Sequence, residues 1–529
     1  MFLDAEASGW PEDLNADICL IGSGVMGLAL TQHLLAHSKA RILLIEQGAL
    51  EDSEELSAVP AERNSGDLVS AVAASRAQGF GGSSLRWGGQ ALPFFPRDLE
   101  DRPFLDLRGP WPLTLADLAP YYDQAGSFLE LDPIPFDTNL WHDPVLEKTF
   151  GPTRVLETNF SKWSPIAYLP NRYRPIIAKS ERVTCICKAR VVAVQLNREG
   201  SKVEGVQVRR GKGQEALLRA KLVVLCGGGI ENPRLLLASR QGDRQGIGNE
   251  HDLVGRFYQD HIGFYAAHLE PMNWRLFEHL FAAFLKGNQK FLPKVQLSQA
   301  QQISQQLLNV TGNLAIQENE DAPRQAARRI YRKIRGLSNE NTSILADSKR
   351  LIKAPISAIH IARSYLRRRL HLPRQARYFL MANAESEPLH ASRILLDGSL
   401  DDDGQPRPLV QWRCSDRSKM ALQAYVAGLR DSLEQSGIAR VHPSTYLTAP
   451  DLDWKERAYS LYHHIGATRM AASARQGVVD AHGQIFSVAN LYVAGTSVLP
   501  TGSASNPSFT ALALTLRLGD HLLRHLPRS

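Results

Sequence analysis

The sequence predicts an α/β protein in which a dinucleotide-binding domain of the Rossmann type is joined to a second domain, a sheet with helices on it. Three observations lead to this prediction. A glycine-rich turn separates a strand-like run from a helical pattern near the start of the chain, a second apolar run ends in glycines at 227–229, and 529 residues suffice for two or more domains.

The first element is the stretch 17–46, which reads strand, glycine turn, helix and strand. Gly22 permits a tight turn, Gly24 lets the backbone approach a pyrophosphate at the helix N-terminus, and Gly27 lets helix and strand pack closely. Glu46 ends the second strand, where a carboxylate can accept a hydrogen bond from a ribose hydroxyl. This fingerprint predicts a bound dinucleotide, either NAD or FAD.

Two later stretches are also rich in glycine. Residues 78–90 mix glycine with serine, which suits a backbone that passes close to a phosphate or a flat ring, although a flexible loop is the alternative. The apolar run 222–226 ends in Gly227 and two more glycines before a helix at 232–239. That pattern is typical of a second dinucleotide-binding turn, so we expect distant segments to complete the first domain.

A helix at 118–129 is expected within the first domain, and one at 416–436 in the second. The further strands that we expect are 182–195, 202–210, 378–384, 393–396 and 409–413. We therefore interpret 261–442 as the second domain.

The segment 322–377 is strongly basic, with 15 Lys and Arg against two acidic residues, a net charge of +13 where the whole chain carries +7. It belongs to an insert at about 270–375 in which apolar residues recur at near-helical spacing. These residues are Ile352, Ile356, Ile359, Leu366 and Leu370, preceded by an aromatic stripe of Trp274, Phe277, Phe281 and Phe284.

This basic amphipathic pattern has two interpretations. We favour a helical lid that packs its apolar face on its own domain, and the alternative is contact with an anionic membrane surface or another polyanion. No nucleic-acid-binding motif accompanies the charge, so we expect no nucleic-acid partner.

Neither a secretory signal nor a metal site is predicted. The first twelve residues lack the basic and apolar regions of a signal peptide, and no apolar run reaches about 18 residues. The five cysteines show no metal-ligand spacing. We therefore expect a cytoplasmic protein. The alternative is a cytoplasmic protein whose basic insert also contacts the membrane surface.

The C-terminal part carries the chemistry. His463-His464 stands in a conspicuous run that ends at Met470, and the stretch 490–510 contains several glycines and an Asn-Pro pair at Asn506. Together with the opening fingerprint, Gly81-Gly82-Ser83-Ser84 and the segment 252–261, this pattern resembles the glucose-methanol-choline (GMC) family of FAD oxidoreductases. The motifs occur in the family's order, whereas about 270–375 matches nothing in the family that we can place.

The resemblance implies an FAD-binding domain assembled from 1–260 and 443–529, and between them a substrate domain, 261–442, on an antiparallel sheet. It implies oxidation of an alcohol, with hydride passing from the carbinol carbon to the flavin N5. Carried over by motif, the cofactor contacts fall on Gly22, Ser23, Gly24, Gly27, Glu46, Gly81, Gly82, Ser83, Val191, Gly227, Gly495, Thr496, Pro507 and Ser508.

His463 matches the family's catalytic histidine, seven residues before Met470, and Asn506 falls where the family places a second His or Asn. An imidazole with a pKa near about 6.5 can accept the hydroxyl proton at neutral pH, and an amide can position the substrate oxygen. The alternatives are a hydrogen-bonded core histidine at His463 and an ordinary helix N-cap at Asn506. His464 is the weaker candidate for the base.

Some family members attach FAD covalently through a histidine just before the Trp of the glycine-serine loop. This sequence has Arg86 there, which predicts non-covalent FAD. The Gly-Gly-Gln that follows Trp87 is similar to members that act on sugars, so we favour a sugar or glycoside hydroxyl as the substrate. The alternatives are a long-chain or steroid alcohol at a membrane, a redox-silent lyase that keeps FAD, and a pure binding protein. The sequence contains no haem-attachment motif, so electrons would pass to a separate acceptor such as oxygen or a quinone.

Overall fold

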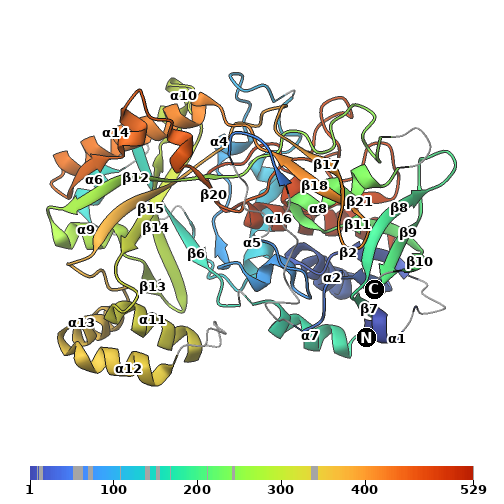
Figure 1. Ribbon diagram of the computed structural model, residues 1–529, viewed down its shortest axis with the longest axis horizontal. Helices are drawn as coiled ribbons and strands as arrows, with labels where there is room; N and C mark the ends of the chain where they lie inside the picture. The colour runs from blue at the N-terminus through green and yellow to red at the C-terminus, as the bar shows by residue number, and fades with distance from the viewer. Residues whose placement is uncertain are drawn as a thin grey trace.

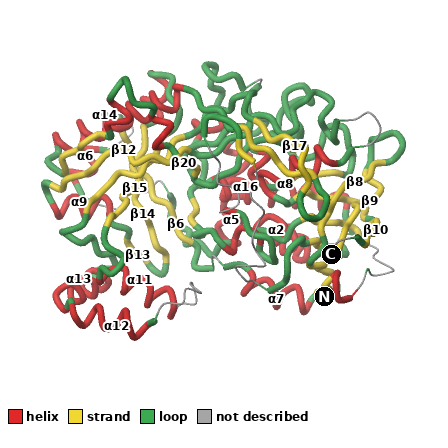
Figure 2. Tube along the Cα trace, viewed as in Figure 1, coloured by secondary structure: helices red, strands yellow, loops and turns green. Residues whose placement is uncertain are grey.

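The computed structural model describes residues 1–8, 10, 16–51, 63–68, 75–107, 109–136, 143–150, 155–166, 168–210, 213–240, 245–334 and 343–527. These residues form two halves, one built on a parallel sheet and the other on an antiparallel sheet (Figure 1, Figure 2). Both chain ends lie on the parallel-sheet side (Figure 1).

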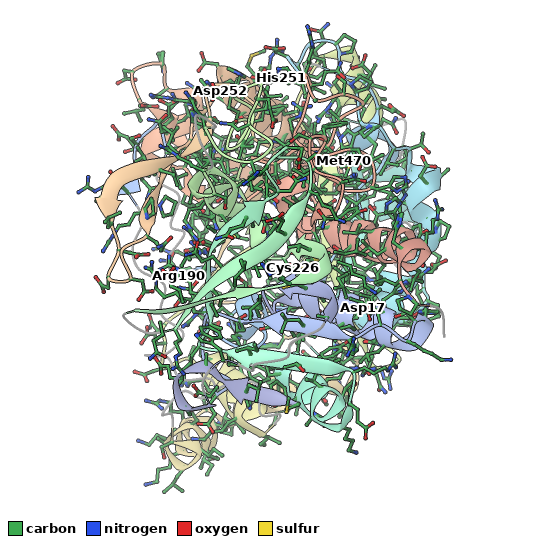
Figure 3. The ribbon with its side chains drawn as sticks, turned by 90° about the vertical axis from the view of Figure 1, so that its right-hand side faces the viewer. Asp17, Arg190, Cys226, His251, Asp252 and Met470 are labelled. Atoms are coloured by element: carbon green, nitrogen blue, oxygen red, sulfur yellow. The ribbon has the colours of Figure 1, made fainter. Side chains whose placement is uncertain are left out.

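The parallel sheet confirms the predicted Rossmann-like domain. Every neighbouring pair of its six strands is parallel, and β2 is buried along its whole length, as expected for a sheet that is covered on both faces. Figure 3 labels Asp17 near the start of β2 and Cys226 just after the end of β11. In sheet order the strands are β1 (Phe2–Asp4), β7 (Val183–Cys187), β3 (Ile42–Ile45), β2 (Ala16–Ile21), β11 (Ala220–Leu225) and β21 (Leu491–Val493).

Helices from distant parts of the chain complete this half. The last long helix packs against both α2 and α5, so the C-terminal segment covers the N-terminal fingerprint. The helices are α2 (Val25–His37), α5 (Leu115–Phe128), α8 (Gly228–Ala238) and α16 (Pro507–Leu522), with the shorter α1 (Ala5–Ser8), α4 (Pro96–Leu99) and α7 (Pro170–Lys179).

The second half is built on a nine-stranded antiparallel sheet, as the resemblance implies. Helix α14 (Asp416–Gln435) packs on it. Three of its strands, β5, β6 and β20, come from outside the range 261–442 that we assigned to this half. The strands in order are β19 (Ala439–Pro443), β12 (Ile262–Pro271), β16 (Arg377–Ala384), β15 (Val310–Gln317), β14 (Gln289–Leu297), β6 (Leu156–Trp163) and β5 (Gln90–Ala91), with β13 (Phe284–Lys286) beside β14 and β20 (Tyr459–Ser460) beside β12.

Two three-stranded sheets lie outside the two large ones, β10-β9-β8 and β17-β18-β4. The prediction of a single strand over 182–195 is wrong, because that segment contributes β7 to one sheet and β8 to another. The chain turns between them at Lys188, which has a φ of 53°. The bounds are β8 (Arg190–Leu196), β9 (Val203–Arg210), β10 (Gln214–Leu218), β4 (Arg63–Asn64), β17 (Arg393–Leu400) and β18 (Pro406–Gln411).

The basic insert is only partly helical. Strands β13, β14 and β15 lie inside the range 270–375 and belong to the large antiparallel sheet, and Phe284 of the expected aromatic stripe lies on β13. The helical part is a three-helix unit that projects from the antiparallel-sheet half (Figure 1). Its helices are α11 (Pro323–Ile334), α12 (Ile344–Lys353) and α13 (Pro355–Leu366); the remaining helices of this half are α6 (Pro144–Thr149), α9 (Trp274–Phe281), α10 (Gln299–Ser304) and α15 (Thr445–Thr448).

The favoured lid interpretation is wrong for the last of these helices. None of the residues of α13 is buried, and its Ile356, Ile359 and Leu366 side chains are mostly exposed rather than packed on the substrate-side domain.

Candidate active site

Three glycine turns meet beside β2 and β11. A Cβ added to Gly22, whose φ is 108°, would lie 2.8 Å from the carbonyl oxygen of Cys226 and 3.3 Å from the backbone nitrogen of Gly227. A Cβ added to Gly82, whose φ is 52°, would lie 2.9 Å from the Cα of Gly24. Any side chain at Gly22 or Gly82 would therefore force these backbones apart, so the structure brings together the three turns that the sequence singled out.

The same packing explains Gly27, because a Cβ there would lie 2.0 Å from the carbonyl oxygen of Gly22. The second turn is also tied to the first by a hydrogen bond, in which the backbone nitrogen of Gly81 donates to the carbonyl oxygen of Ser23 at 3.1 Å. These contacts hold the start of α2 at a fixed position against the loop that precedes Arg86.

Glu46 accepts four hydrogen bonds. Its Oε2 accepts from the backbone nitrogen of Ser23 at 3.0 Å and from the Ser23 hydroxyl at 2.7 Å, and its Oε1 accepts from the backbone nitrogens of Gly48 and Gly79 at 2.9 and 3.2 Å. A carboxylate offers about four lone-pair sites. Glu46 therefore joins the first glycine turn to the second, a structural role that the motif alone did not indicate, and its contact with a ribose stays a prediction.

Val191 lies two residues after a backbone contact with Glu46. It is buried in β8, two residues after Ala189, whose backbone nitrogen donates to the carbonyl oxygen of Glu46 at 2.9 Å. A cavity of about 300 Å³ opens next to it, lined in part by Gly48 and Arg190. The contact of Val191 with a cofactor stays a prediction.

Two long helices begin at this region without a side-chain cap. Gly24, which has no side chain, is the N-cap of α2, and Asn506 is the N-cap of α16, where its side chain accepts no hydrogen bond from the helix. Pro507 and Ser508 form the first turn of α16. Free N–H groups and the helix dipole favour negative charge at such a helix N-terminus.

The remaining predicted cofactor residues lie on either side of the catalytic loop. Gly495 has a φ of 117°, and the next hydroxyl, that of Thr496, donates to the carbonyl oxygen of His464 at 2.6 Å. Ser83 is an exposed member of a short 3-10 turn, Gly82–Leu85, and no contact within the described residues joins it to the helix starts. The structure therefore links Thr496 to the histidine pair and leaves Ser83 at the surface.

His463 stands at the end of a chain of hydrogen bonds. Its Nδ1 lies 2.7 Å from Nδ1 of His261, and Nε2 of His261 lies 3.0 Å from the carbonyl oxygen of Gly502. Its backbone nitrogen donates to Oδ1 of Asp260 at 2.8 Å, which holds the loop in place. Of the residues that the structure describes, none makes a recorded hydrogen bond to Nε2 of His463.

The carbonyl oxygen of Gly502 fixes the protonation of both imidazoles. A carbonyl can only accept, so Nε2 of His261 carries the proton. Burial lowers the pKa of His261 to about 4, which keeps the ring neutral and makes its Nδ1 an acceptor. The proton between the rings therefore belongs to Nδ1 of His463, and a neutral His463 presents a lone pair at Nε2.

Burial and neighbouring charges keep His463 neutral. Its pKa lies well below the usual range because of desolvation first, and then because of the positive charges that His261 and Lys294 would bring close to it. Lys294 is a buried residue of β14, and burial lowers its own pKa to about 8. An imidazole held neutral in this way can accept a proton across the neutral pH range.

His464 is oriented differently from its neighbour. Its Nδ1 lies 2.8 Å from the hydroxyl of Tyr258 and its Nε2 lies 3.0 Å from the hydroxyl of Ser75, so both ring nitrogens are engaged. Burial lowers the pKa of His464 to about 3. These contacts give His464 the structural role of a buried, hydrogen-bonded histidine, which was one of the two interpretations considered for His463.

Asn506 keeps its side-chain oxygen unpaired. Its Oδ1 is buried and has no hydrogen-bond partner among the described residues, although a buried acceptor without a partner costs about 1–3 kcal/mol. Asn506 follows Gly502 by four residues and so lies on the same loop that fixes the histidines. It occupies the N-cap position without acting as a cap, which leaves the amide available to a bound molecule.

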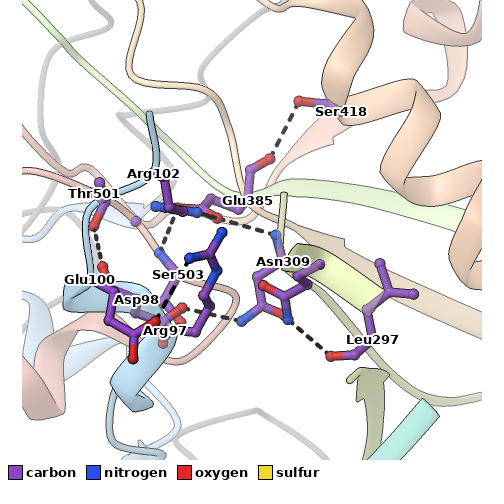
Figure 4. Close-up of polar contacts among 12 residues, drawn as sticks. Arg97, Asp98, Glu100, Arg102, Leu297, Asn309, Glu385, Ser418, Thr501 and Ser503 are labelled. Carbon is purple, nitrogen blue, oxygen red and sulfur yellow. Dashed lines mark hydrogen bonds and ion pairs between the residues drawn. The ribbon is translucent and has the colours of Figure 1, made fainter. Parts of the chain in front are cut away.

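A buried polar network supports this loop (Figure 4). Arg102 donates two hydrogen bonds of 2.7 Å to the carboxylate of Glu385, and both side chains are almost wholly inaccessible to solvent. Glu385 also accepts from the backbone nitrogen of Ser503 at 3.3 Å. The hydroxyl of Ser503 in turn donates to Asp98 at 2.7 Å.

This network reaches the catalytic chain through the residues on both sides of Gly502. Thr501 donates to the carbonyl oxygen of Asp98 at 2.9 Å, and Ser503 is held as described above. Burial, and next the charge of Glu385, raise the pKa of Asp98 to about 6. Asp98 and Glu385 therefore position the carbonyl oxygen that sets the protonation of His261.

Sequence reasoning missed His261, Asp260 and Lys294 as individual residues. His261 and Asp260 belong to the segment 252–261, which the motif pattern contained, but their roles depend on partners about 200 residues away. Lys294 carried no signal beyond being a lysine in an apolar, strand-like run.

Comparison with models of protein families identifies the family of this chain. Two family models match it, both described as GMC oxidoreductase, one at residues 170–263 and the other at residues 388–515. The chain belongs to the GMC oxidoreductase family. This confirms the resemblance drawn from its sequence motifs.

Relatives of this GMC oxidoreductase span nearly its whole length. The 2-methyl-1,2-propanediol dehydrogenase of Mycolicibacterium austroafricanum is 24% identical over 489 residues, 84% of this chain and 80% of the relative. The fructose dehydrogenase large subunit of Gluconobacter japonicus is 21% identical over 97% of this chain and 99% of the relative. The 6'''-hydroxyparomomycin C oxidase of Streptomyces lividus is 22% identical over 96% and 92%.

Solved structures share its fold. Pyridoxine 4-oxidase from Mesorbium loti superimposes with a TM-score of 0.56 at 17% identity and covers 96% of this chain and 99% of that one. A formate oxidase superimposes with a TM-score of 0.58 at 15% identity, over 97% and 98%.

GMC oxidoreductases bind FAD, and the residues present fit that cofactor. The uncapped start of α2 at Gly24 and the close approach of Gly82 form a backbone surface suited to a pyrophosphate. The uncapped start of α16 and the unpaired Oδ1 of Asn506 lie on the loop that holds the catalytic histidines, where a flavin ring would be in reach of polar groups.

Proposed function

We propose that this GMC oxidoreductase oxidises an alcohol CH–OH group to a carbonyl, with His463 as the general base. The observation that supports it most directly is the hydrogen-bond chain from Gly502 through His261 to His463, which leaves an unprotonated Nε2. A base that is neutral and pre-oriented needs no rearrangement before it accepts a proton.

In the proposed reaction the substrate O–H bond breaks and its proton moves to Nε2 of His463. The C–H bond of the carbinol carbon breaks with departure of a hydride as the C=O bond forms, and a bound FAD would supply the acceptor for that hydride. Nδ1 of His463 stays hydrogen-bonded to Nδ1 of His261 throughout, which keeps the ring in one orientation. Its proton returns to solvent when the carbonyl product leaves.

Asn506 has the proposed role of holding the substrate oxygen. Its amide lies at the start of α16 and its Oδ1 has no partner within the described chain, so the group can bind the hydroxyl and keep it in line with His463. The helix N-terminus at Pro507 would favour the negative charge that the reduced cofactor gains.

A sugar or glycoside hydroxyl is the substrate class that we propose. The support is the Gly88-Gly89-Gln90 sequence after Trp87 and the fructose dehydrogenase large subunit among the relatives. Electrons would then leave to a separate acceptor such as oxygen or a quinone.

An anaerobic absorbance titration tests the activity. Bleaching of the oxidised flavin band by one class among sugars, glycosides, aliphatic alcohols and sterols would establish the redox reaction and its substrate class. Retained colour with all of them, together with cyanohydrin cleavage, would favour a redox-silent lyase and contradict the proposal.

His463→Ala tests the base. We expect FAD to stay bound and the rate of flavin reduction to fall by about 10²-fold or more, with partial rescue by added imidazole, because only the proton acceptor is removed. His442→Ala, at a half-exposed histidine, is the matched control and should leave the rate unchanged. An unaltered rate in the first variant would remove His463 from the mechanism.

We also propose that FAD is held without a covalent bond, because Arg86 stands where some relatives carry the attaching histidine. Acid precipitation should release the yellow colour to the supernatant, and colour that stays in the pellet would refute this.

A further inference from the structure

The three-helix unit α11–α13 exposes large apolar side chains to solvent. Five of them lie on α12 and α13 and are between 62 and 82% exposed: Leu345, Ile352, Ile356, Ile359 and Leu366. We name these five residues the apolar face. Large exposed apolar side chains gathered on one unit are unusual for a monomeric soluble surface and mark a site of interaction.

The apolar side chains share sides of their helices with basic residues. On α12, Leu345, Lys349 and Ile352 are spaced i, i+4 and i+7, so they lie on one side. On α13, the residues Ile356, Ile359, Arg363 and Leu366 follow the spacing i, i+3, i+7 and i+10 and also share a side. Each helix therefore presents a mixed apolar and cationic side.

Both sides point away from α11. Asp347, on the opposite side of α12, is buried and forms an ion pair with Arg329 of α11 at 2.6 Å. On α13, Ser357 and Ile361 line a cavity together with the start of α11, and they lie on the side opposite Ile356 and Ile359. The apolar face consequently lies on the side of α12 and α13 that is turned away from α11.

The surrounding charge identifies the kind of partner. Lys349, Lys353, Arg363 and Arg367 are exposed, and no ion pair with a described residue is recorded for them. The segment 322–377 has a net charge of +13, so a second copy placed against the same surface would be repelled. An anionic surface with an apolar interior matches both the charge and the exposed leucine and isoleucine side chains.

The helices are too short to cross a bilayer. At 1.5 Å per residue, α12 with 10 residues and α13 with 12 residues would extend about 15–18 Å, against a hydrocarbon core of about 30 Å. Across the described residues no helix has the length and apolar character of a membrane span. The unit can therefore lie in the plane of the interface but not span it.

We propose that α12 and α13 dock this GMC oxidoreductase on an anionic bilayer surface, with the apolar face inserted between lipid headgroups and the basic side chains at the phosphates. The apolar contact holds the protein at the interface, and the cations select membranes that contain anionic lipid. This docking does not depend on the proposed alcohol oxidation.

Vesicle co-sedimentation of the full-length protein tests the proposal. The wild type should bind phosphatidylcholine vesicles that contain phosphatidylglycerol and bind vesicles of pure phosphatidylcholine much less. The triple variant Ile352→Glu, Ile356→Glu, Ile359→Glu should bind at least about tenfold more weakly, and each of Arg363→Gln and Arg367→Gln about fivefold more weakly.

A matched control separates the apolar face from general surface charge. The triple variant Leu400→Glu, Met420→Glu, Met272→Glu introduces the same charges at residues that are 51–58% exposed on other elements, and it should bind like the wild type. Both triple variants should keep their flavin absorbance and solution activity, which shows that they fold.

Three results would overturn the proposal. They are failure of the wild type to bind either vesicle, equal loss of binding in the two triple variants, and an oligomer that dissociates in the α12–α13 variant while vesicles remain unbound. In each case the flavin-reduction experiments are unaffected, so failure of docking and failure of the oxidation remain distinguishable.

Discussion

His463 and His261 form a pair whose protonation is set by a single backbone carbonyl oxygen. Because Nε2 of His261 must donate to Gly502, the proton between the rings is assigned to Nδ1 of His463. Nε2 of His463 therefore carries a lone pair. Two neutral imidazoles are needed for this, and burial of both rings provides that condition. Lys294 contributes as a nearby positive charge that disfavours protonation of either ring.

The pH dependence of kcat/KM follows from these shifts. A lowered pKa at His463 keeps the base form present at more acidic pH, so the acid limb should lie below about 6.5, the ordinary value for histidine. Lys294→Met should move that limb to higher pH, because the positive charge that lowers the pKa of His463 is lost. Rate profiles from about pH 4 to 8 measure both.

An acid limb at or above the ordinary pKa of histidine would contradict the neutral state of His261 and His463. An acid limb that does not move in Lys294→Met would show that the Lys294 charge does not lower the pKa of His463. The substitution retains an unbranched apolar side chain in β14, so its effect on packing is small.

The sequence could identify His463 because spacing to Met470 is a local property. It could not identify His261 as the group that sets the protonation, because that role depends on Gly502, which lies 241 residues away. Asn506 was predicted from the motif as a positioning group, with an ordinary helix N-cap as the alternative, and the structure shows the N-cap position without the capping hydrogen bond.

At the scale of elements, the glycine turns were the most predictable part of the molecule. Strand, turn and helix at 17–46 follow local chemistry, and the observed β2 and α2 agree with it. The split of 182–195 into β7 and β8 was not predictable from strand-forming residues, because it arises at Lys188, whose backbone nitrogen donates to the carbonyl oxygen of Gly48. Tertiary contacts decided that boundary.

Gly82→Ala tests the backbone surface that the turns form. A methyl group there would lie 2.9 Å from the Cα of Gly24 in a left-handed conformation, so we expect FAD affinity to fall by at least about tenfold. Gly126→Ala in α5 is the control, because nothing lies within 4 Å of the added carbon, and it should bind FAD normally. Fluorescence titration of the apoprotein measures both, and equal affinities would argue against a role for the Gly82 approach.

At the scale of the whole molecule, the network around Arg102 and Glu385 joins segments that are hundreds of residues apart (Figure 4). A buried ion pair adds little when intact, but removing one partner leaves the other charge buried. The network therefore makes the position of the 501–503 loop depend on both halves of the fold.

Glu385→Gln should destabilise the protein by about 3–5 kcal/mol, because it leaves Arg102 without its buried counter-charge. Glu270→Gln, which breaks an exposed pair with Arg440, should cost less than about 1 kcal/mol. Denaturant unfolding measures both, and a small loss in the first variant would indicate that the network is rearranged without penalty.

The exchange of strands between the halves has a consequence for handling the protein in pieces. β14 pairs with β6 through eight residue pairs, and β6 lies about 100 residues upstream of 261–442. A fragment that begins at 261 would leave that flank of β14 without its neighbour, as an open template for strands of other copies. Expressed alone, the substrate-side segment should therefore precipitate. Moving this domain from one relative to another would require exchanging at least three separate stretches of the gene together.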